Sequence, residues 1–147
     1  MKKRSGDASL ANEAGGEDCV TGIKSFKDLI AWQKGMDLVA AVYHASETFP
    51  SVERFGLAAQ LRRAAVSVPS NVAEGYSRPS RADYVRFLDI ARGSLNEIET
   101  QLLLAIRLGY VNAVSVESTL ALTVELQRIL KGLARSLRDS RKAMVDM

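Results

Sequence analysis

The sequence predicts an all-α protein folded as an antiparallel, up-down four-helix bundle. Four successive segments carry apolar residues every three or four positions, which is the spacing of one helix face. Only short connections separate these segments, so consecutive helices are expected to run in opposite directions. No segment alternates apolar and polar residues in the manner of a half-buried strand.

The first two helices are predicted between about residues 27 and 48 and between Ser51, a candidate N-cap, and Gly75. Phe49-Pro50 should end the first helix, because the residue before a proline is disfavoured in the α conformation. Pro69 lies inside the second helix, where we expect a kink and not a break. The expected core residues are Leu29, Trp32, Met36, Val39 and Tyr43, followed by Leu57, Leu61, Ala64, Val68 and Val72.

The third helix is predicted from Arg81 to Leu108, with Ser80 and Asp83 as a capping pair and Gly109 as the stop. The fourth should begin near Asn112. The expected core residues of the third helix are Tyr84, Phe87, Leu88, Ala91, Leu95, Ile98, Leu102 and Ala105. Those of the fourth helix are Val116, Leu120, Leu126, Leu130, Leu133 and Leu137.

A chain of 147 residues suits one domain. We expect a weakly ordered N-terminal arm at 1–24, the bundle at 25–140 and a C-terminal tail at 141–147. Cys19 is the only cysteine, which excludes an intrachain disulfide and fits a reducing compartment. No apolar run is long enough to span a membrane or to act as a signal peptide, so we expect a cytoplasmic protein.

The second and third helices carry more apolar residues than one bundle core requires. Val66 and Ala73 lie off the core stripe of the second helix, and Ile90, Leu104 and Leu108 lie off that of the third. We interpret this surplus as a subunit interface. Alternatively, the residues contact a neighbouring helix of the same bundle, or they are isolated and without consequence. Gly93-Ser94 in the middle of the third helix favours close packing.

A polar stripe on the second helix contains Arg63, Ser67, Ser70 and Glu74. It is either a solvated face or a lining that faces another subunit or a central opening, with Arg62 or Arg63 bridging to Glu97 or Glu99. The predicted oligomer interface or structural polar network therefore comprises Arg62, Arg63, Val66, Ser67, Ser70, Asn71, Glu74, Ile90, Gly93, Ser94, Glu97, Glu99 and Leu104.

The fourth helix ends in a basic stretch. Arg128, Lys131, Arg135 and Arg138 are spaced 3, 4 and 3 residues apart, so they share a face that could follow a phosphate backbone or an acidic partner. Alternatively, they are favoured there only because cations stabilise a helix C-terminus. The chain has 13 arginines and 7 lysines, a bias toward forked pairing with phosphates or carboxylates, but its net charge is only +3.

No constellation of catalytic residues is evident. His44 is the only histidine, and Cys19 has no activating neighbour in the sequence. The glycine-rich phosphate loop, the zinc protease motif and the nucleophile elbow are all absent. We therefore expect no enzymatic activity, no catalytic residue, no metal and no cofactor.

Several runs of residues resemble a known family. The segments are RRAAVSVPSNVAEG from Arg62 to Gly75, FLDIARGSLNEIETQL from Phe87 to Leu102, and LGY at 108–110, preceded by Phe26, Leu29, Trp32 and Phe49-Pro50. They resemble the four-helix-bundle proteins first noticed as products of intervening sequences in bacterial 23S ribosomal RNA genes. The resemblance covers residues 25 to 137, nearly all of the predicted bundle.

The resemblance implies a ring-like homopentamer without known enzymatic activity. The accessory protein of diversity-generating retroelements is similar, and it is a basic pentamer that engages a reverse transcriptase and RNA. We therefore expect a homo-oligomeric scaffold that contacts RNA or an RNA-handling protein. Two alternatives stay open: a protein-interaction module whose basic end binds an acidic partner, and a small helical enzyme that uses Arg62, Arg63 and Glu97 around an anionic substrate.

Overall fold

The computed structural model describes residues 22–146, and their side chains from 22 to 140. Within that range the chain forms four α-helices and three short 3-10 helices, and no strand. The α-helices are α3 (Ile30–Ser46), α4 (Leu57–Tyr76), α5 (Arg81–Arg107) and α6 (Glu117–Asp146); the 3-10 helices are η1 (Phe26–Asp28), η2 (Ser51–Glu53) and η3 (Val114–Val116). The predicted all-helical fold is confirmed. Residues 1–21 of the predicted arm, including Cys19, lie outside the described residues.

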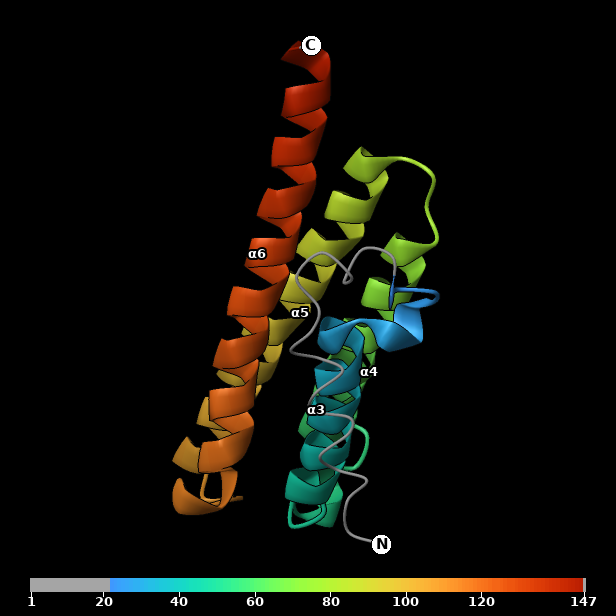
Figure 1. The fold of residues 1–147 in the computed structure, drawn as a ribbon. Coiled ribbons are helices and arrows are strands. Elements are labelled where there is room, and N and C mark those ends of the chain that lie inside the picture. Colours follow the sequence, from blue (N-terminus) through green and yellow to red (C-terminus); the bar gives the residue numbers. More distant parts are fainter. Residues whose placement is uncertain (1–21, 147) are drawn as a thin grey trace, which may run out of the picture.

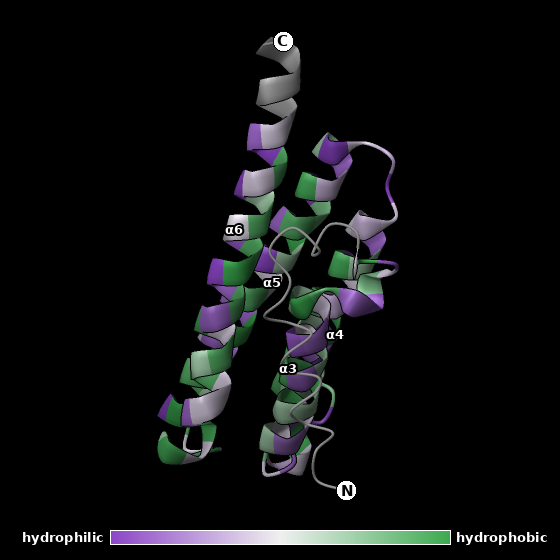
Figure 2. Ribbon diagram, viewed as in Figure 1, coloured by the Kyte–Doolittle hydropathy of each residue, from purple (hydrophilic) through white to green (hydrophobic). Residues whose placement is uncertain are grey.

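The four helices pack as an up-down bundle (Figure 1). Helix α4 packs against both α3 and α5, and α6 packs against both α5 and α3. Helices α3 and α5 therefore occupy opposite corners of the bundle. Hydrophobic and hydrophilic residues alternate along each helix (Figure 2), as expected for helices that bury one face. The largest fully buried side chains come from all four: Leu38, Leu61, Leu88, Leu95, Ile98, Leu102, Leu126 and Leu130.

The core face of α3 differs from the predicted one. Met36 and Tyr43 were expected inside but are 47% and 43% exposed, whereas Ala31, Gly35 and Leu38 are buried. The physical reason is close packing on α4, because a Cβ atom added at Gly35 would lie 3.2 Å from the Cβ atom of Pro69. Small residues permit this approach, and the helix is rotated so that they face inward.

The predicted core stripes of α4 and α5 agree better with the structure. All five predicted core residues of α4 are buried, and so are the predicted residues of α5 from Leu88 to Ala105. Tyr84 and Phe87, near the start of α5, are only half-buried. Helix α4 is continuous through Pro69, which is itself buried. The kink expected there stays a prediction.

The N-terminus of α4 is capped differently from the prediction. Ser51 was expected to cap this helix, but it belongs to η2, and α4 begins six residues later at Leu57. The backbone N–H of Leu57 donates to the Glu53 carboxylate over 2.9 Å. The acceptor for this helix end is therefore a carboxylate carried by the preceding 3-10 turn.

Both predicted ends of α5 are found. Ser80 Oγ accepts a hydrogen bond from the Asp83 N–H over 3.2 Å. At the other end Gly109 adopts a φ of +79°, and its N–H donates to the Ile106 carbonyl while the Tyr110 N–H donates to that of Ala105. This pair of bonds is the Schellman arrangement, in which glycine supplies the left-handed residue. Helix α6 begins at Glu117 after η3 and continues past residue 140.

At one end of the bundle, the connection between α3 and α4 is joined to the connection between α5 and α6. The Tyr110 hydroxyl donates to Glu53 Oε2 over 2.8 Å, the Thr48 hydroxyl donates to the Tyr110 carbonyl over 3.1 Å, and the rings of Phe49 and Tyr110 are 5.5 Å apart. The bonds from the Leu57 N–H and the Tyr110 hydroxyl hold the pKa of Glu53 below its ordinary value of 4.5. The hydrogen bond between Tyr110 and Glu53 also raises the pKa of the Tyr110 hydroxyl.

The lowered pKa of Glu53 predicts a specific loss of stability in acid. Because the folded-state pKa is below the unfolded one, this contribution is present above about pH 4.5 and is lost as the pH falls through the lower folded-state value. Glu53→Gln should therefore lose less stability than wild type on acidification, as measured by urea midpoints at about pH 7 and about pH 3.5. Tyr110→Phe, which removes one of the two bonds, should give an intermediate dependence. Identical pH dependence in all three proteins would contradict this account.

The contact between α4 and α5 at Gly75 leaves no room for a side chain at this position. A Cβ atom there would lie 2.9 Å from the Phe87 Cβ atom and 3.2 Å from the Tyr84 carbonyl oxygen. Gly75→Ala should lower the free energy of unfolding by about 1–3 kcal/mol through overpacking. Gly132→Ala is the control, because a Cβ atom there meets nothing within 4 Å, and it should raise the free energy of unfolding by up to about 1 kcal/mol. Equal effects in urea unfolding would contradict the predicted clash.

Candidate functional site

The outward face of α5 carries a regular exposed stripe. Its residues are spaced 3, 4, 3 and 4 positions apart and all are exposed: Ile90, Gly93, Glu97, Thr100 and Leu104. Ile90 and Leu104 are each 42% exposed. A Cβ atom added at Gly93 would meet nothing within 4 Å, so no group of the described chain occupies the space beside this glycine. We call this set the α5 outer stripe.

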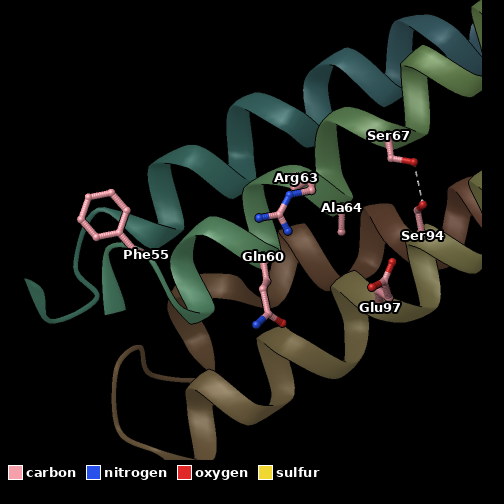
Figure 3. A pocket seen from close by; sticks show the side chains of 7 residues that line it. All are labelled: Phe55, Gln60, Arg63, Ala64, Ser67, Ser94 and Glu97. Carbon is pink, nitrogen blue, oxygen red and sulfur yellow. Dashed lines mark hydrogen bonds between the residues drawn. The ribbon is translucent and has the colours of Figure 1, made fainter. Parts of the chain in front are cut away.

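A groove of about 480 Å³ runs between α4 and α5, beside this stripe (Figure 3). The hydroxyls of Ser67 and Ser94 share a hydrogen bond of 2.8 Å in it, and the Asn71 amide donates to Ser67 Oγ over 2.9 Å. Phe55, 87% exposed, extends from the loop that precedes α4. The lining residues are Phe55, Gln60, Arg63, Ala64, Ser67, Ser94 and Glu97.

The arginines of α4 do not make the expected bridges. Arg62 lies on the side of α4 that faces α3, where its Nε donates to Ser46 Oγ over 2.7 Å and its guanidinium lies 4.7 Å from the centre of the Tyr43 ring. Arg63 lines the groove with Glu97. Within residues 22–140, no ion pair joins either arginine to Glu97 or to Glu99. For Arg62 the reason is angular, since adjacent helix positions diverge by about 100° and Arg63 occupies the groove side of α4.

The remaining members of the predicted polar network are separated along α4. Glu74 forms an ion pair with Arg78 at the C-terminal end of the helix. Val66 and Ser70 are exposed on the outer face, whereas Ser67 turns toward α5. The expected stripe of Arg63, Ser67, Ser70 and Glu74 is therefore divided between the groove and the solvent-facing surface.

A second, basic groove of about 770 Å³ lies between α5 and α6. It brings Arg128, Lys131 and Arg138 of the predicted basic face together with Arg92 of α5. Arg135 is exposed but does not line this groove. The full lining is Asp89, Arg92, Gly93, Asn96, Val124, Gln127, Arg128, Lys131 and Arg138.

One carboxylate opposes the four cations of this basic groove. Asp89 lies 3.4 Å from the Arg138 guanidinium and 3.6 Å from that of Arg92. The Gln127 amide donates to the Arg92 carbonyl over 3.0 Å and to Asn96 Oδ1 over 2.9 Å, which joins the two helices at the floor. Among the ion pairs of residues 22–140, none involves Arg128 or Lys131. The groove is thus electropositive, with two cations directed to solvent.

Sequence reasoning missed Arg92 because it is 36 positions from Arg128 and on another helix. The sequence did contain one indication of its role. Arg92 and Asn96 are four residues apart, so they lie on the same side of α5, and this is the side that faces α6.

Two searches of the described residues concern metal ions and membrane spans. Residues 22–140 hold no group of three or more His, Cys, Asp or Glu side chains able to bind a metal ion. His44 is exposed and lies 3.7 Å from the carboxylate of Glu47. Over the described range, every helix is too short or too polar to cross a membrane.

Comparisons with known proteins agree with this fold. Residues 27–132 match the family model described as 23S rRNA-intervening sequence protein. A crystal structure from Bacteroides thetaiotaomicron, of a protein with unknown function from the S23 ribosomal protein family, is similar with a TM-score of 0.66. It is 24% identical over 71% of this chain and 98% of that chain, which shows a shared fold. A search of curated proteins finds no match. The chain belongs to the 23S rRNA-intervening sequence protein family, as the resemblance predicted.

Proposed function

We propose that this member of the 23S rRNA-intervening sequence protein family is a non-enzymatic scaffold that assembles with copies of itself in the cytoplasm. Five copies is the number that the family resemblance implies. The assembled scaffold would present the basic groove between α5 and α6 to RNA, or to an RNA-handling protein. The solved relative is a protein with unknown function, so the proposal depends on this chain's own surfaces.

The observation that carries self-assembly is the α5 outer stripe. Its apolar side chains, Ile90 and Leu104, are continued by the exposed Leu108 at the end of the helix. Between them Gly93 costs about 1 kcal/mol of helix stability relative to alanine. No contact within the described chain compensates for that cost, because the space beside Gly93 is open. An apolar stripe around an uncompensated glycine is what a closely packed partner helix requires.

RNA contact is supported by the basic groove. Four cations converge there against a single carboxylate, and the arginine guanidinium suits the paired oxygens of a phosphate. No aromatic side chain lines the groove, so it offers no platform on which a base could stack. The groove therefore suits sequence-independent contact with a phosphate backbone.

An enzymatic role for the other groove has weaker support. The hypothesis required Arg62, Arg63 and Glu97 to converge on an anionic substrate. Arg62 is instead engaged by Ser46 and Tyr43 on the α3 side. The serine hydroxyls of the groove are hydrogen-bonded to each other, and no histidine lines it as a general base.

Self-assembly predicts a native mass several times that of the 16.0 kDa chain. Gly93→Leu should lower this mass toward that of the single chain, because the leucine occupies the space that a partner would fill. Gly132→Leu, on the exposed face of α6 and equally open, should leave the mass unchanged. Sedimentation velocity checks both variants. A wild-type monomer, or equal dissociation in both variants, would contradict an interface on α5.

RNA contact predicts salt-sensitive binding to single-stranded RNA. Four phosphate contacts give a slope of about −3 in a plot of log affinity against log salt. Arg128→Ala with Lys131→Ala should weaken binding and make the slope shallower by about 1.4. Asp89→Asn should strengthen binding, because it releases Arg92 and Arg138 from their carboxylate.

The control for charge alone is Lys24→Ala with Lys27→Ala, which removes two exposed lysines near η1 and should leave the slope intact. Fluorescence anisotropy at several salt concentrations measures all four proteins. If the two double variants behave alike, the groove is not the binding site. A salt-insensitive wild type that still captures an acidic protein after nuclease treatment would favour the interaction module without a nucleic-acid role.

A further inference from the structure

Helix α3 carries a second exposed stripe with the same spacing as the one on α5. Its members lie 3, 4, 3 and 4 positions apart and all are exposed: Gln33, Met36, Ala40, Tyr43 and Glu47. We call this set the α3 outer stripe. Its two large side chains, Met36 and Tyr43, are those that the packing of Gly35 on Pro69 turns outward. Because α3 and α5 occupy opposite corners of the bundle, one molecule cannot bring the two stripes together.

The two stripes lie at matching levels along the bundle. Gly35 is level with Pro69 of α4, and Ser67 of α4 is level with Ser94 of α5. Helices α4 and α5 are antiparallel. Pro69, two residues after Ser67 in α4, is therefore level with about residue 92, two residues before Ser94 in α5. Gly35 is thus level with about residue 92, and Met36 with Gly93. The contact of Gly75 with Tyr84 and Phe87 shows that the α4–α5 register continues along the helices.

At these levels the side chains of the two stripes alternate in size. Met36 is level with Gly93, and one heptad later Tyr43 is level with Thr100. Between them, Ala40 is level with Glu97. At these three levels, each large residue on one helix corresponds to a small or short one on the other, which is the condition for knobs on one helix to enter holes on its partner. At the two ends of the stripes, Gln33 is level with Ile90 and Glu47 with Leu104, and both members of each pair are large.

A ring of copies would bring these stripes into contact in register. Helices α3 and α5 run in the same direction, and rotation about an axis along the bundle changes neither direction nor level. A ring also needs two different surfaces on each copy, because its interfaces are head-to-tail. We infer that the α5 outer stripe of one copy packs in parallel against the α3 outer stripe of the next, with Met36 seated over Gly93. This inference rests on the proposed self-assembly and names the two surfaces that form it.

Disulfide cross-linking tests the register. In the full-length chain with Cys19→Ser, the pair Met36→Cys and Gly93→Cys should form bonds between copies on mild oxidation. Denaturing gels without reductant should then show a ladder of covalent oligomers and loss of the monomer band. The control pairs Met36→Cys with Leu104→Cys, which lies eleven residues, about 16 Å, further along α5. A disulfide requires Cα atoms within about 7 Å, so this pair should stay monomeric on the gel.

A size exchange provides an independent measurement that requires no oxidation. Gly93→Met should dissociate the oligomer by filling the space that Met36 occupies, and adding Met36→Ala should restore its native mass. Circular dichroism confirms that each variant is helical, so loss of assembly is separated from loss of folding.

The outcomes separate this inference from the proposal on which it rests. An oligomer that cross-links through the Leu104 pair, or through neither pair, would overturn the α3–α5 register and leave the scaffold standing. An oligomer in which the Met36→Ala addition does not rescue Gly93→Met would overturn the seating of Met36 over Gly93. A monomeric wild type would overturn both proposals.

Discussion

The close contact between Gly35 and Pro69 is the constraint on which the arrangement of the bundle depends. Pro69 cannot donate a helical hydrogen bond, yet it lies in a continuous α4 and is buried. Its ring is covered by the one residue of α3 that has no side chain to displace. The distance between α3 and α4 is therefore short, and α3 must present Ala31, Gly35 and Leu38 inward.

The outer surface follows from that rotation. Turning the small residues of α3 inward turns Met36 and Tyr43 outward, where Tyr43 receives the guanidinium of Arg62. Arg62 is thereby withdrawn from the groove on the other side of α4, and Arg63 is left there opposite Glu97. The packing of α3 on α4 thus determines that Arg62 faces α3 and that Arg63 faces the groove between α4 and α5. It also creates the apolar stripe that a second copy could use.

Helix α5 separates two grooves of different character. On the α4 side, serine hydroxyls and an asparagine amide satisfy one another, so the contact between helices is polar but internally hydrogen-bonded. On the α6 side, Asp89 forms ion pairs with Arg92 and Arg138, and the Gln127 amide donates to the Arg92 carbonyl. Arg128 and Lys131 are left exposed to solvent. A surface that combines an apolar stripe with an adjacent electropositive groove suits both assembly and contact with an anion.

The sequence by itself determined the number of helices, the core faces of α4 and α5 and the two ends of α5. These features depend on local chemistry: apolar periodicity, the Ser80 hydroxyl and the left-handed glycine at Gly109. Only the tertiary structure decided the rotation of α3, the partner of Arg62 and the entry of Arg92 into the basic groove. Each of these depends on residues far apart in the chain. Apolar periodicity predicted Met36 and Tyr43 as core residues of α3 because they are more hydrophobic than Ala31 and Gly35. The structure places Gly35 in the core instead, because its contact with Pro69 leaves no room for a side chain.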